Sequence, residues 1–312
     1  MKRNAKSALS IFAASAILAL TLAGCGGGND STDTSAPADN SGSEASTTAV
    51  VSGTVSTNGS TSMEKVIGSL KEQFQKDNDG QVTVSYDATG SGAGIEAVTN
   101  GTTDIGLSSR ALKDEETSAG LTGTTVALDG IAVIVNADSQ VSDLSVEQIG
   151  QIFSGQITNW KEVGGDDAKI VVLNRKAGSG TRATFEAAVF GDEAVDFKGD
   201  AELDKSGDVQ TQMGSTDNAI SYLDFSHFDD SKFNAIKVEG VEPKSANVTD
   251  DSFKIWATEH MYCSKDADEA TTAFLEFMLS DDVQGKLVEE QGFIPVSAMK
   301  VVKDASGKVS AK

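Results

Sequence analysis

From Val50 onward the chain alternates apolar runs typical of strands with amphipathic segments typical of helices, and this alternation is what most constrains its fold. Residues 131–135 and 169–173 are nearly continuous apolar runs, as expected for strands buried on both faces. Strands that alternate with helices predict an α/β fold with mostly parallel sheets, whose ligands bind near helix N-termini. Further strands are expected at 82–86 and 103–107, and helices at 63–74, 95–98, 146–153, 184–190 and, as one long element, 274–288.

The N-terminus has the features of an export signal. Residues 1–6 are basic, and residues 8–22 form an apolar run that fits the core of a signal peptide better than a spanning helix. The run ends in the sequence LAGC, which resembles the cleavage site of bacterial lipoproteins, with a lipid placed on Cys25. We therefore expect a cleaved signal peptide over residues 1–24; the alternative is an ordinary signal peptide that happens to precede a cysteine.

A polar segment separates this signal from the folded body. Residues 25–49 are mostly Gly, Ser, Thr, Asp and Ala, and they cannot bury enough apolar surface to offset the entropy of ordering them. We expect them to form a lipid anchor and a disordered tether. With Cys25 lipidated, Cys263 has no partner, and we expect it to behave as a small buried apolar side chain.

Composition excludes several classes of function. The chain has 47 acidic against 25 basic residues, a net charge of −22, which disfavours binding to nucleic acid phosphates. Two histidines and two cysteines are too few and too scattered for most zinc or iron–sulfur sites, so no metal or other cofactor is expected. His227 and His260 are isolated and are expected at the surface, and no nucleophile with a neighbouring base suggests an enzyme.

Three loops, at residues 58–62, 89–94 and 175–182, share one composition and one position. Each is rich in Gly, Ser and Thr and lies between an expected strand and an expected helix. The free N–H groups and partial positive charge of a helix N-terminus bind oxyanions, and glycine allows the backbone to approach them closely. The third loop does not fit the Walker P-loop and the second does not fit the dinucleotide-binding pattern, so nucleotide binding is disfavoured. Arg175 is the best candidate for a bidentate contact to the anion, with Arg110 and Arg182 as alternatives.

At these residues the chain resembles the phosphate-binding lipoproteins of phosphate-specific (Pst-type) ABC transporters. The similarity extends over nearly all of residues 51–296. The segment from Arg175 to Arg182, of the form Arg-x-x-Gly-Ser-Gly-Thr, is its most specific part. The other matching segments are 59–62, 90–94, 104–110, 157–160, 219–222 and 292–296.

The resemblance implies a two-lobe, periplasmic-binding-protein-like fold of type II, with the ligand in the cleft between the lobes. Each lobe is then a mostly parallel sheet flanked by helices. We place the chain's two crossings near residues 129–133 and 255–263. Lobe 1 would comprise residues 50–130 plus 258–312, and lobe 2 residues 131–257. The lobes are expected to close on the ligand by a hinge.

The resemblance also implies the residues that bind the anion, and this sequence departs from the family at two of them. In part of the family an Asp that accepts the proton of phosphate stands where this chain has Ser109, and an acid stands where it has Ala177. We therefore hypothesise that Asp129, just before an apolar strand, accepts that proton. Such a carboxylate would reject sulfate, which carries no proton. The expected phosphate-binding residues are Thr61, Ser62, Ser91, Ser109, Asp129, Arg175, Ser179, Gly180 and Thr181.

The function implied by the resemblance is high-affinity capture of inorganic phosphate outside the cytoplasm and its delivery to the permease of an ABC transporter. The expected partners are phosphate, the permease subunits and, through the lipid on Cys25, the cell membrane; the chain is expected to be a monomer. A receptor for tungstate, molybdate or sulfate is the alternative on the same fold. A phosphatase would need catalytic groups that the sequence does not suggest, and an adhesin would leave the three loops unexplained.

Overall fold

The computed structural model describes residues 50–303 and 308–312, apart from 192–194, 196 and 198. Strands within these residues form a nine-stranded sheet and two two-stranded sheets. The large sheet contains β1 (Gly53–Gly59), β2 (Val82–Ala88), β3 (Ile105–Ser108), β4 (Thr122–Asn136), β6 (Val171–Arg175), β7 (Ala201–Leu203), β8 (Ala219–Asp224), β9 (Phe233–Ala235) and β11 (Trp256–Cys263). The small sheets pair β5 (Asp143–Leu144) with β10 (Lys237–Val238) and β12 (Val301–Lys303) with β13 (Val309–Ala311).

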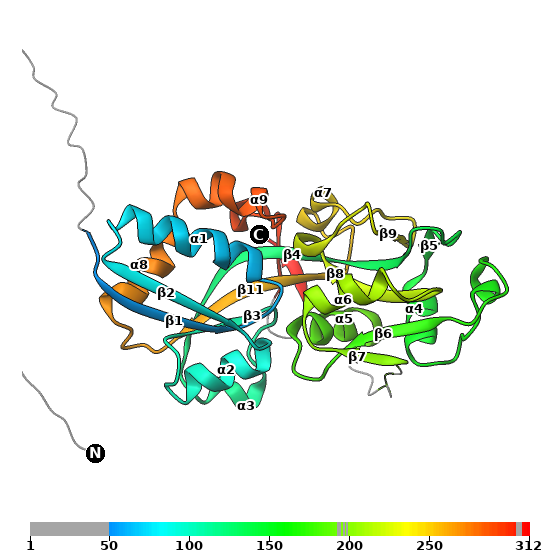
Figure 1. Ribbon diagram of the computed structural model, residues 1–312, viewed down its shortest axis with the longest axis horizontal. Helices are drawn as coiled ribbons and strands as arrows, with labels where there is room; N and C mark the ends of the chain where they lie inside the picture. Colours follow the sequence, from blue (N-terminus) through cyan, green and yellow to red (C-terminus); the bar gives the residue numbers. More distant parts are fainter. Residues whose placement is uncertain (1–49, 192–194, 196, 198, 304–307) are drawn as a thin grey trace, which may run out of the picture. The chain divides into compact units, whose positions relative to one another are not determined.

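The large sheet is mixed, in the order β2-β1-β3-β11-β4-β8-β6-β7, with β9 paired to β4 (Figure 1). Its two ends are parallel, because β1 pairs in parallel with β2 and β3, and β6 with β7 and β8. The pairs β3–β11, β11–β4 and β4–β8 are antiparallel. The expected parallel strands are therefore present, but two antiparallel strands, β4 and β11, join the two parallel groups.

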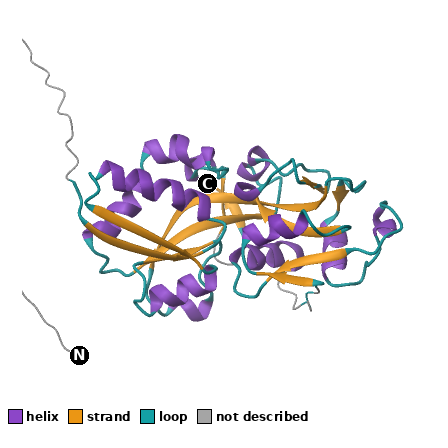
Figure 2. Ribbon diagram, viewed as in Figure 1, coloured by secondary structure: helices purple, strands orange, loops and turns teal. Residues whose placement is uncertain are grey.

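Helices cover both faces of the parallel groups (Figure 2). They are α1 (Glu64–Asp77), α2 (Ser91–Thr99), α3 (Asp114–Thr117), α4 (Val146–Phe153), α5 (Gly180–Phe190), α6 (Ser206–Met213), α7 (Ser245–Thr249), α8 (Glu269–Met278) and α9 (Val288–Glu290). Near the N-terminal group, α1 and α8 pack in one core with β1–β3, whereas α2 packs with Tyr262 in another cluster. Near the second group, α4 and α5 share one core, and α6 packs in another.

β4 and β11 run from one large core to the other. Along β4, Val126 and Ala127 pack in the core of α1 and α8, and residues from Leu128 onward pack in the core of α4 and α5 or that of α6. Along β11, Trp256 lies in the second of these cores and Met261 in the first. These strands contain both segments at which crossings were expected. The predicted lobe boundaries fall inside them, and the division into residues 50–130 plus 258–312 and 131–257 stays a prediction.

One expected element is wrong in extent. The apolar pattern over residues 274–288 predicted a single helix, but α8 ends at Met278 and a π-helical turn follows at Val283–Leu287. The Gln284 side chain is buried and donates from Nε2 to the carbonyl oxygens of Met278 and Val126, each at 2.8 Å. This side chain satisfies a carbonyl at the end of α8, so the helix ends there although the apolar spacing continues.

None of the helices in the described part of the chain is both long and apolar enough to cross a membrane. Cys263 is a free, buried thiol, as expected. The predicted signal peptide, the lipidated Cys25 and the tether of residues 25–49 lie outside the described residues.

Candidate functional site

The three Gly- and Ser-rich loops all join a strand to a helix, as the sequence predicts. They connect β1 to α1, β2 to α2 and β6 to α5. The second and third loops are in contact, because Gly92 N–H donates to the carbonyl oxygen of Gly178 at 3.0 Å. A Cβ built on Gly180 would overlap the Ser91 hydroxyl and lie 3.1 Å from the Cβ of Ser109. Two loops that are far apart in the chain therefore meet with no room for an added methyl group at Gly180.

The predicted binding residues lie together and are buried. None of the side chains is more than 7% exposed, so their polar groups need partners within the protein or from a ligand. Buried in this way are Thr61, Ser62, Ser91, Ser109, Asp129, Arg175, Ser179 and Thr181, together with Gly180.

Arg175 is a buried cation with no carboxylate partner among the described residues. Its Nη2 donates to Thr61 Oγ1 at 3.0 Å and to the Asp204 carbonyl oxygen at 3.0 Å, and its Nη1 donates to Ser206 Oγ at 3.2 Å. Its Nε has no hydrogen-bond partner in the described part of the chain. The resemblance implies an acid at position 177 in the family, but this chain has Ala177 there. Neutral oxygens, rather than a carboxylate, therefore contact the guanidinium of Arg175. A buried charge is costly unless it is paired, so this guanidinium is suited to receive an anion.

The two alternative arginines are already paired. Arg110 forms a two-point ion pair with Glu116, with N–O distances of 2.7 and 2.8 Å. Arg182 Nε lies 2.8 Å from a Glu186 oxygen. Neither arginine has an unpaired charge to offer, and this distinguishes Arg175 from both.

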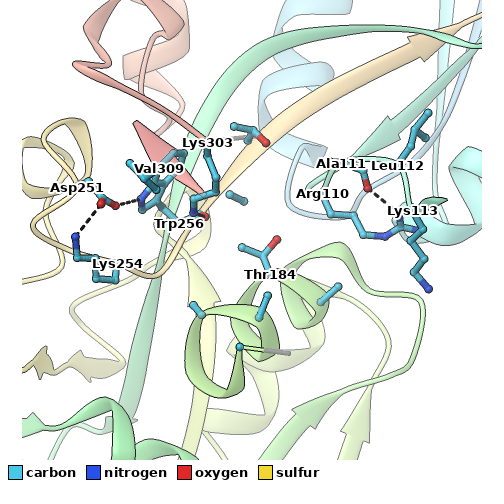
Figure 3. A pocket seen from close by; sticks show the side chains of 16 residues that line it. Arg110, Ala111, Leu112, Lys113, Thr184, Asp251, Lys254, Trp256, Lys303 and Val309 are labelled. Carbon is cyan, nitrogen blue, oxygen red and sulfur yellow. Dashed lines mark hydrogen bonds and ion pairs between the residues drawn. The ribbon is translucent and has the colours of Figure 1, made fainter. Parts of the chain in front are cut away.

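Arg110 instead lines a separate cavity of about 540 Å³ (Figure 3). Trp256 and Lys303 also line it, and the Lys303 ammonium lies 3.5 Å from the centre of the Trp256 indole ring. Burial lowers the pKa of Lys303 to about 8. None of the three Gly- and Ser-rich loops forms this cavity, so it is distinct from the site around Arg175.

Asp224 organises two hydroxyls beside Arg175. Its Oδ1 accepts a hydrogen bond from Thr181 Oγ1 at 3.0 Å, and its Oδ2 accepts one from Ser206 Oγ at 2.9 Å. Ser179 caps α5, because its Oγ accepts from the Arg182 N–H at 3.2 Å. The hydroxyl proton of Ser179 stays available to donate, since this bond uses only a lone pair.

Asp129 is fully buried beside these groups. Ser226 binds both carboxyl oxygens, with Ser226 Oγ donating to Oδ2 at 2.7 Å and Ser226 N–H donating to Oδ1 at 3.4 Å. Burial raises the pKa of Asp129 well above its usual value, and the charges of Asp224 and Glu259 raise it further. Ser226 links Asp129 to the first of the three loops, because its Oγ also lies 3.5 Å from the Ser62 carbonyl oxygen. The role of Asp129 as proton acceptor stays a prediction.

Sequence reasoning missed a third buried acid, Glu259. Its Oε1 lies 3.0 Å from Ser62 Oγ, and its Oε2 has no hydrogen-bond partner among the described residues. Ser62 Oγ also contacts Ser60 Oγ at 2.8 Å and Ser109 Oγ at 2.7 Å, and Ser60 and Ser109 contact each other. Burial raises the pKa of Glu259 to about 8, and the charge of Asp224 contributes to this rise.

This raised pKa predicts a dependence of stability on pH. The folded chain holds the Glu259 proton up to about pH 8, whereas the unfolded chain releases it near the ordinary value of 4.5. Stability is therefore lost as pH rises from about 4.5 to 8, by about 1 kcal/mol per pH unit for this group. Glu259→Gln replaces this titratable carboxyl group by an amide. The free energy of unfolding of the variant, measured in urea, is therefore expected to fall less steeply between pH 4.5 and 8. An identical slope in the variant would contradict the prediction.

The expectation that His227 and His260 are surface residues is wrong. His227 is 3% exposed, and its Nδ1 lies 3.1 Å from Ser226 Oγ. His260 is half-buried between the hydroxyls of Thr125 and Thr258. Burial lowers the pKa of both rings, that of His260 to about 4. The hydroxyl partners explain how neutral imidazoles are accommodated inside the protein.

Comparison with known proteins shows the family of this chain. Residues 43–282 match the model of the PBP superfamily domain. The phosphate-binding protein PstS of Bacillus subtilis is 38% identical over 261 residues, which cover 83% of this chain and 86% of the relative. The chain belongs to the PstS family of phosphate-binding proteins.

Solved structures of this family are also similar. A putative phosphate ABC transporter substrate-binding protein from Clostridium perfringens, solved with bound phosphate, is 38% identical with a TM-score of 0.75; the match covers 78% of this chain and all of that one. An ABC-type phosphate transport receptor from Vibrio cholerae is 33% identical with a TM-score of 0.65, covering 77% and 99%. The expected two-lobe α/β fold is confirmed, as is the expectation that the chain is a binding protein and not an enzyme.

The residues that the PstS resemblance did not supply are Ser60, Ser206, Asp224, Ser226 and Glu259. One of them had a signal in the sequence. Along β11, Glu259 shares its face with Ala257 and Met261, which are both buried and apolar. A carboxyl group on a buried apolar face is costly unless it belongs to a polar site. The position of Glu259 in the alternation of the strand therefore indicates a functional residue. The described residues contain no group of three His, Cys, Asp or Glu side chains placed to hold a metal ion.

Proposed function

We propose that this chain captures inorganic phosphate outside the cytoplasm and delivers it to the permease of an ABC transporter. The observation that carries the proposal is the buried Arg175, whose charge has no carboxylate partner among the described residues and which is surrounded by hydroxyl groups. The similar proteins include a phosphate-binding protein, a putative phosphate ABC transporter substrate-binding protein solved with bound phosphate and a phosphate transport receptor, which supports phosphate as the anion.

The proposed binding mode uses local dipoles, because a chain with a net charge of −22 repels anions at long range. Arg175 would contact the anion through its guanidinium, and the N-termini of α2 and α5 would donate backbone N–H groups at Ser91 and Gly180. The hydroxyls of Thr61 and Ser179 add neutral donors. The two lobes would close on the anion and exclude water, which strengthens each of these contacts.

We also propose that a lipid attaches the protein to the membrane. Cleavage after residue 24 and a lipid on Cys25 would anchor the chain to the outer leaflet of the cell membrane or in the periplasm. The polar segment at residues 25–49 would let the body reorient between capture and delivery. The chain is proposed to act as a monomer. Mass spectrometry of the membrane-extracted protein tests the anchor, since an unmodified Cys25 would contradict it.

Calorimetric titration of the chain from residue 26 onward, freed of bound ligand, tests the proposed anion. Phosphate is expected to bind one-to-one with a dissociation constant of about 1 μM or tighter, roughly −8 kcal/mol. Sulfate and tungstate serve as competitors. Tight binding of either of these in place of phosphate would assign the receptor to another oxyanion and contradict the proposal.

Asp129→Asn tests the proposed role of this carboxylate in selectivity. An amide cannot impose the like-charge repulsion that a carboxylate imposes on sulfate, so the ratio of sulfate to phosphate dissociation constants is expected to fall about tenfold. The Asn oxygen can still accept from Ser226, which preserves the local fold. An unchanged ratio in competition calorimetry would remove Asp129 from this role.

A further inference from the structure

We propose that the cavity beside Trp256 and Lys303 is a second ligand site, which binds a small organic anion (Figure 3). The charged group of that anion pairs with the Lys303 ammonium, and its apolar body lies against α5. None of the three Gly- and Ser-rich loops lines the cavity, so this ligand and the anion at Arg175 can be bound together. The second site is therefore independent of the proposed capture of phosphate.

Three parts of the fold enclose this cavity of about 540 Å³. Residues 110–113 follow β3, α5 supplies four small side chains, and Trp256 and Lys303 come from β11 and β12. Figure 3 shows Arg110 and Lys303 on opposite sides of the view, with Thr184 of α5 between them. Sites for small molecules have volumes of about 300–1,000 Å³, so the cavity has room for a ligand larger than an inorganic ion.

Small side chains on α5 keep the cavity open. Ala183 and Ala187 are four residues apart, as are Thr184 and Ala188, so all four lie on one side of the helix. Ala187 is exposed and Ala188 is half-buried, although α5 packs in the core through Phe185. The side of α5 that faces the cavity is therefore mostly apolar and uncovered, and the apolar body of a ligand would remove it from water.

The lining of the cavity is basic although the chain is acidic. The net charge of the chain is −22, but four basic side chains and one acidic side chain occur among the described residues that line the cavity. The basic ones are Arg110, Lys113, Lys254 and Lys303, and the acidic one is Asp251. A cluster of this kind attracts anions and repels cations.

Lys303 is half-buried, and no carboxylate pairs with it in the described part of the chain. Its ammonium lies 3.5 Å from the centre of the Trp256 indole ring and donates to the Trp256 carbonyl oxygen at 2.9 Å. The indole is fully buried, and its Nε1 donates to Asp251 Oδ1 at 2.9 Å, which holds the ring in place. An ammonium has three N–H donors, so Lys303 retains donors for a charge-assisted bond to an anion.

The apolar wall and the unpaired ammonium together select the class of ligand. An inorganic anion would pair with Lys303 but leave the apolar side of α5 in water. A neutral apolar molecule would cover α5 but displace water from the ammonium without replacing its hydrogen bonds, which is costly. An organic anion with a flat apolar body meets both requirements.

Titration with 2-naphthoate, a flat organic anion, tests the site in the chain from residue 26 onward, saturated with phosphate. The chain has two tryptophans, whose indole N–H signals are followed separately in a proton–nitrogen correlation spectrum. We expect the Trp256 signal to shift with a dissociation constant of about 0.1 mM. Trp160 donates from its indole to the Asn218 carbonyl oxygen and does not line the cavity, so its signal is expected to stay in place.

Two comparisons test the charge. Neutral 2-naphthamide has nearly the shape of naphthoate, and its dissociation constant is expected to be at least about tenfold higher. Lys303→Met keeps the length of the side chain and removes its charge, so it is expected to weaken naphthoate binding by a similar factor and to leave naphthamide binding unchanged. Lys303→Arg keeps the charge and can stack on the indole, so it is expected to bind naphthoate within about threefold of the unsubstituted chain.

Two further variants control for position and for folding. Lys300→Met changes an exposed lysine just before β12 that does not line the cavity, and it is expected to leave naphthoate binding unchanged. Ala187→Phe fills the cavity from α5 and keeps Lys303, and it is expected to abolish the shift of the Trp256 signal. Calorimetric titration with phosphate verifies that each variant is folded, because none of these residues belongs to the site around Arg175.

Each outcome decides the proposal. A Trp256 signal that does not move with naphthoate overturns it, as does one that moves no more than the Trp160 signal. Equal affinity for naphthoate and naphthamide, or undiminished naphthoate binding by a folded Lys303→Met chain, also overturns it, because Lys303 would then not hold the anion. If Lys303→Met does not fold, the naphthamide comparison and Ala187→Phe decide instead.

Discussion

Arg175→Met is expected to weaken phosphate binding by about three orders of magnitude, because it removes charge-assisted hydrogen bonds to a buried anion worth about 4 kcal/mol. The guanidinium is 1% exposed, and its present partners are the oxygens of Thr61, Ser206 and Asp204. These partners are neutral, so no positive charge remains at the site when the guanidinium of Arg175 is removed. Calorimetric titration with phosphate measures the loss.

The same substitution is expected to leave the unliganded chain at least as stable as before. Replacement of a buried charge that has no ion partner by an apolar side chain of similar length is often neutral or stabilising. Thermal melting without phosphate should therefore show an unchanged or raised midpoint. A large drop in the midpoint would mean that Arg175 is a structural residue and that the loss of binding reflects unfolding.

Arg110→Met is the matched control. Arg110 was an alternative candidate in the sequence, but its guanidinium is held by Glu116 and lines a different cavity. We expect phosphate affinity to change less than about threefold, as for other substitutions of a partly exposed ion pair. If Arg110→Met abolished binding and Arg175→Met did not, the site would have to be placed at the cavity in Figure 3.

The sequence predicts the loops of this site well because their chemistry is local. A strand followed by Gly, Ser and Thr and then by an amphipathic helix encodes a helix N-terminus without reference to the rest of the fold. The contact of Gly92 with Gly178 confirms that two such loops meet. The position of Arg175 at the end of β6 follows from the same local pattern.

The residues that the sequence does not predict are those whose role depends on contacts between distant segments. Glu259 meets Ser62 across 197 positions, and Ser206 meets Thr61 across 145. Nothing near Ser206 in the sequence separates it from an ordinary residue at a helix start. The buried histidines show the same limit, because the hydroxyl groups that accommodate His260 come from β4 as well as from its own strand.

Gly180→Ala is expected to weaken phosphate binding about 100-fold, by a steric effect that removes none of the polar binding groups. A Cβ at this position would lie 2.9 Å from Ser91 Cβ, which is closer than real Cβ atoms approach other atoms, and 3.1 Å from Ser109 Cβ, which is also a tight contact. The Ser91 hydroxyl could rotate away, but the two Cβ atoms are fixed by their backbones. The added methyl group would therefore hold the N-terminus of α5 away from that of α2.

Gly207→Ala is the control for this substitution, because Gly207 also lies in the first turn of a helix, α6, and has open space around an added Cβ. It is expected to bind phosphate like the unsubstituted chain. If the lobes open as proposed, the α2 and α5 termini separate in the unliganded chain, and Gly180→Ala is then expected to keep the melting midpoint of that state. It is expected to lose most of the increase in the midpoint that phosphate produces. Equal affinities in the two variants would show that the closed contact between Gly180 and Ser91 is not needed to hold the anion.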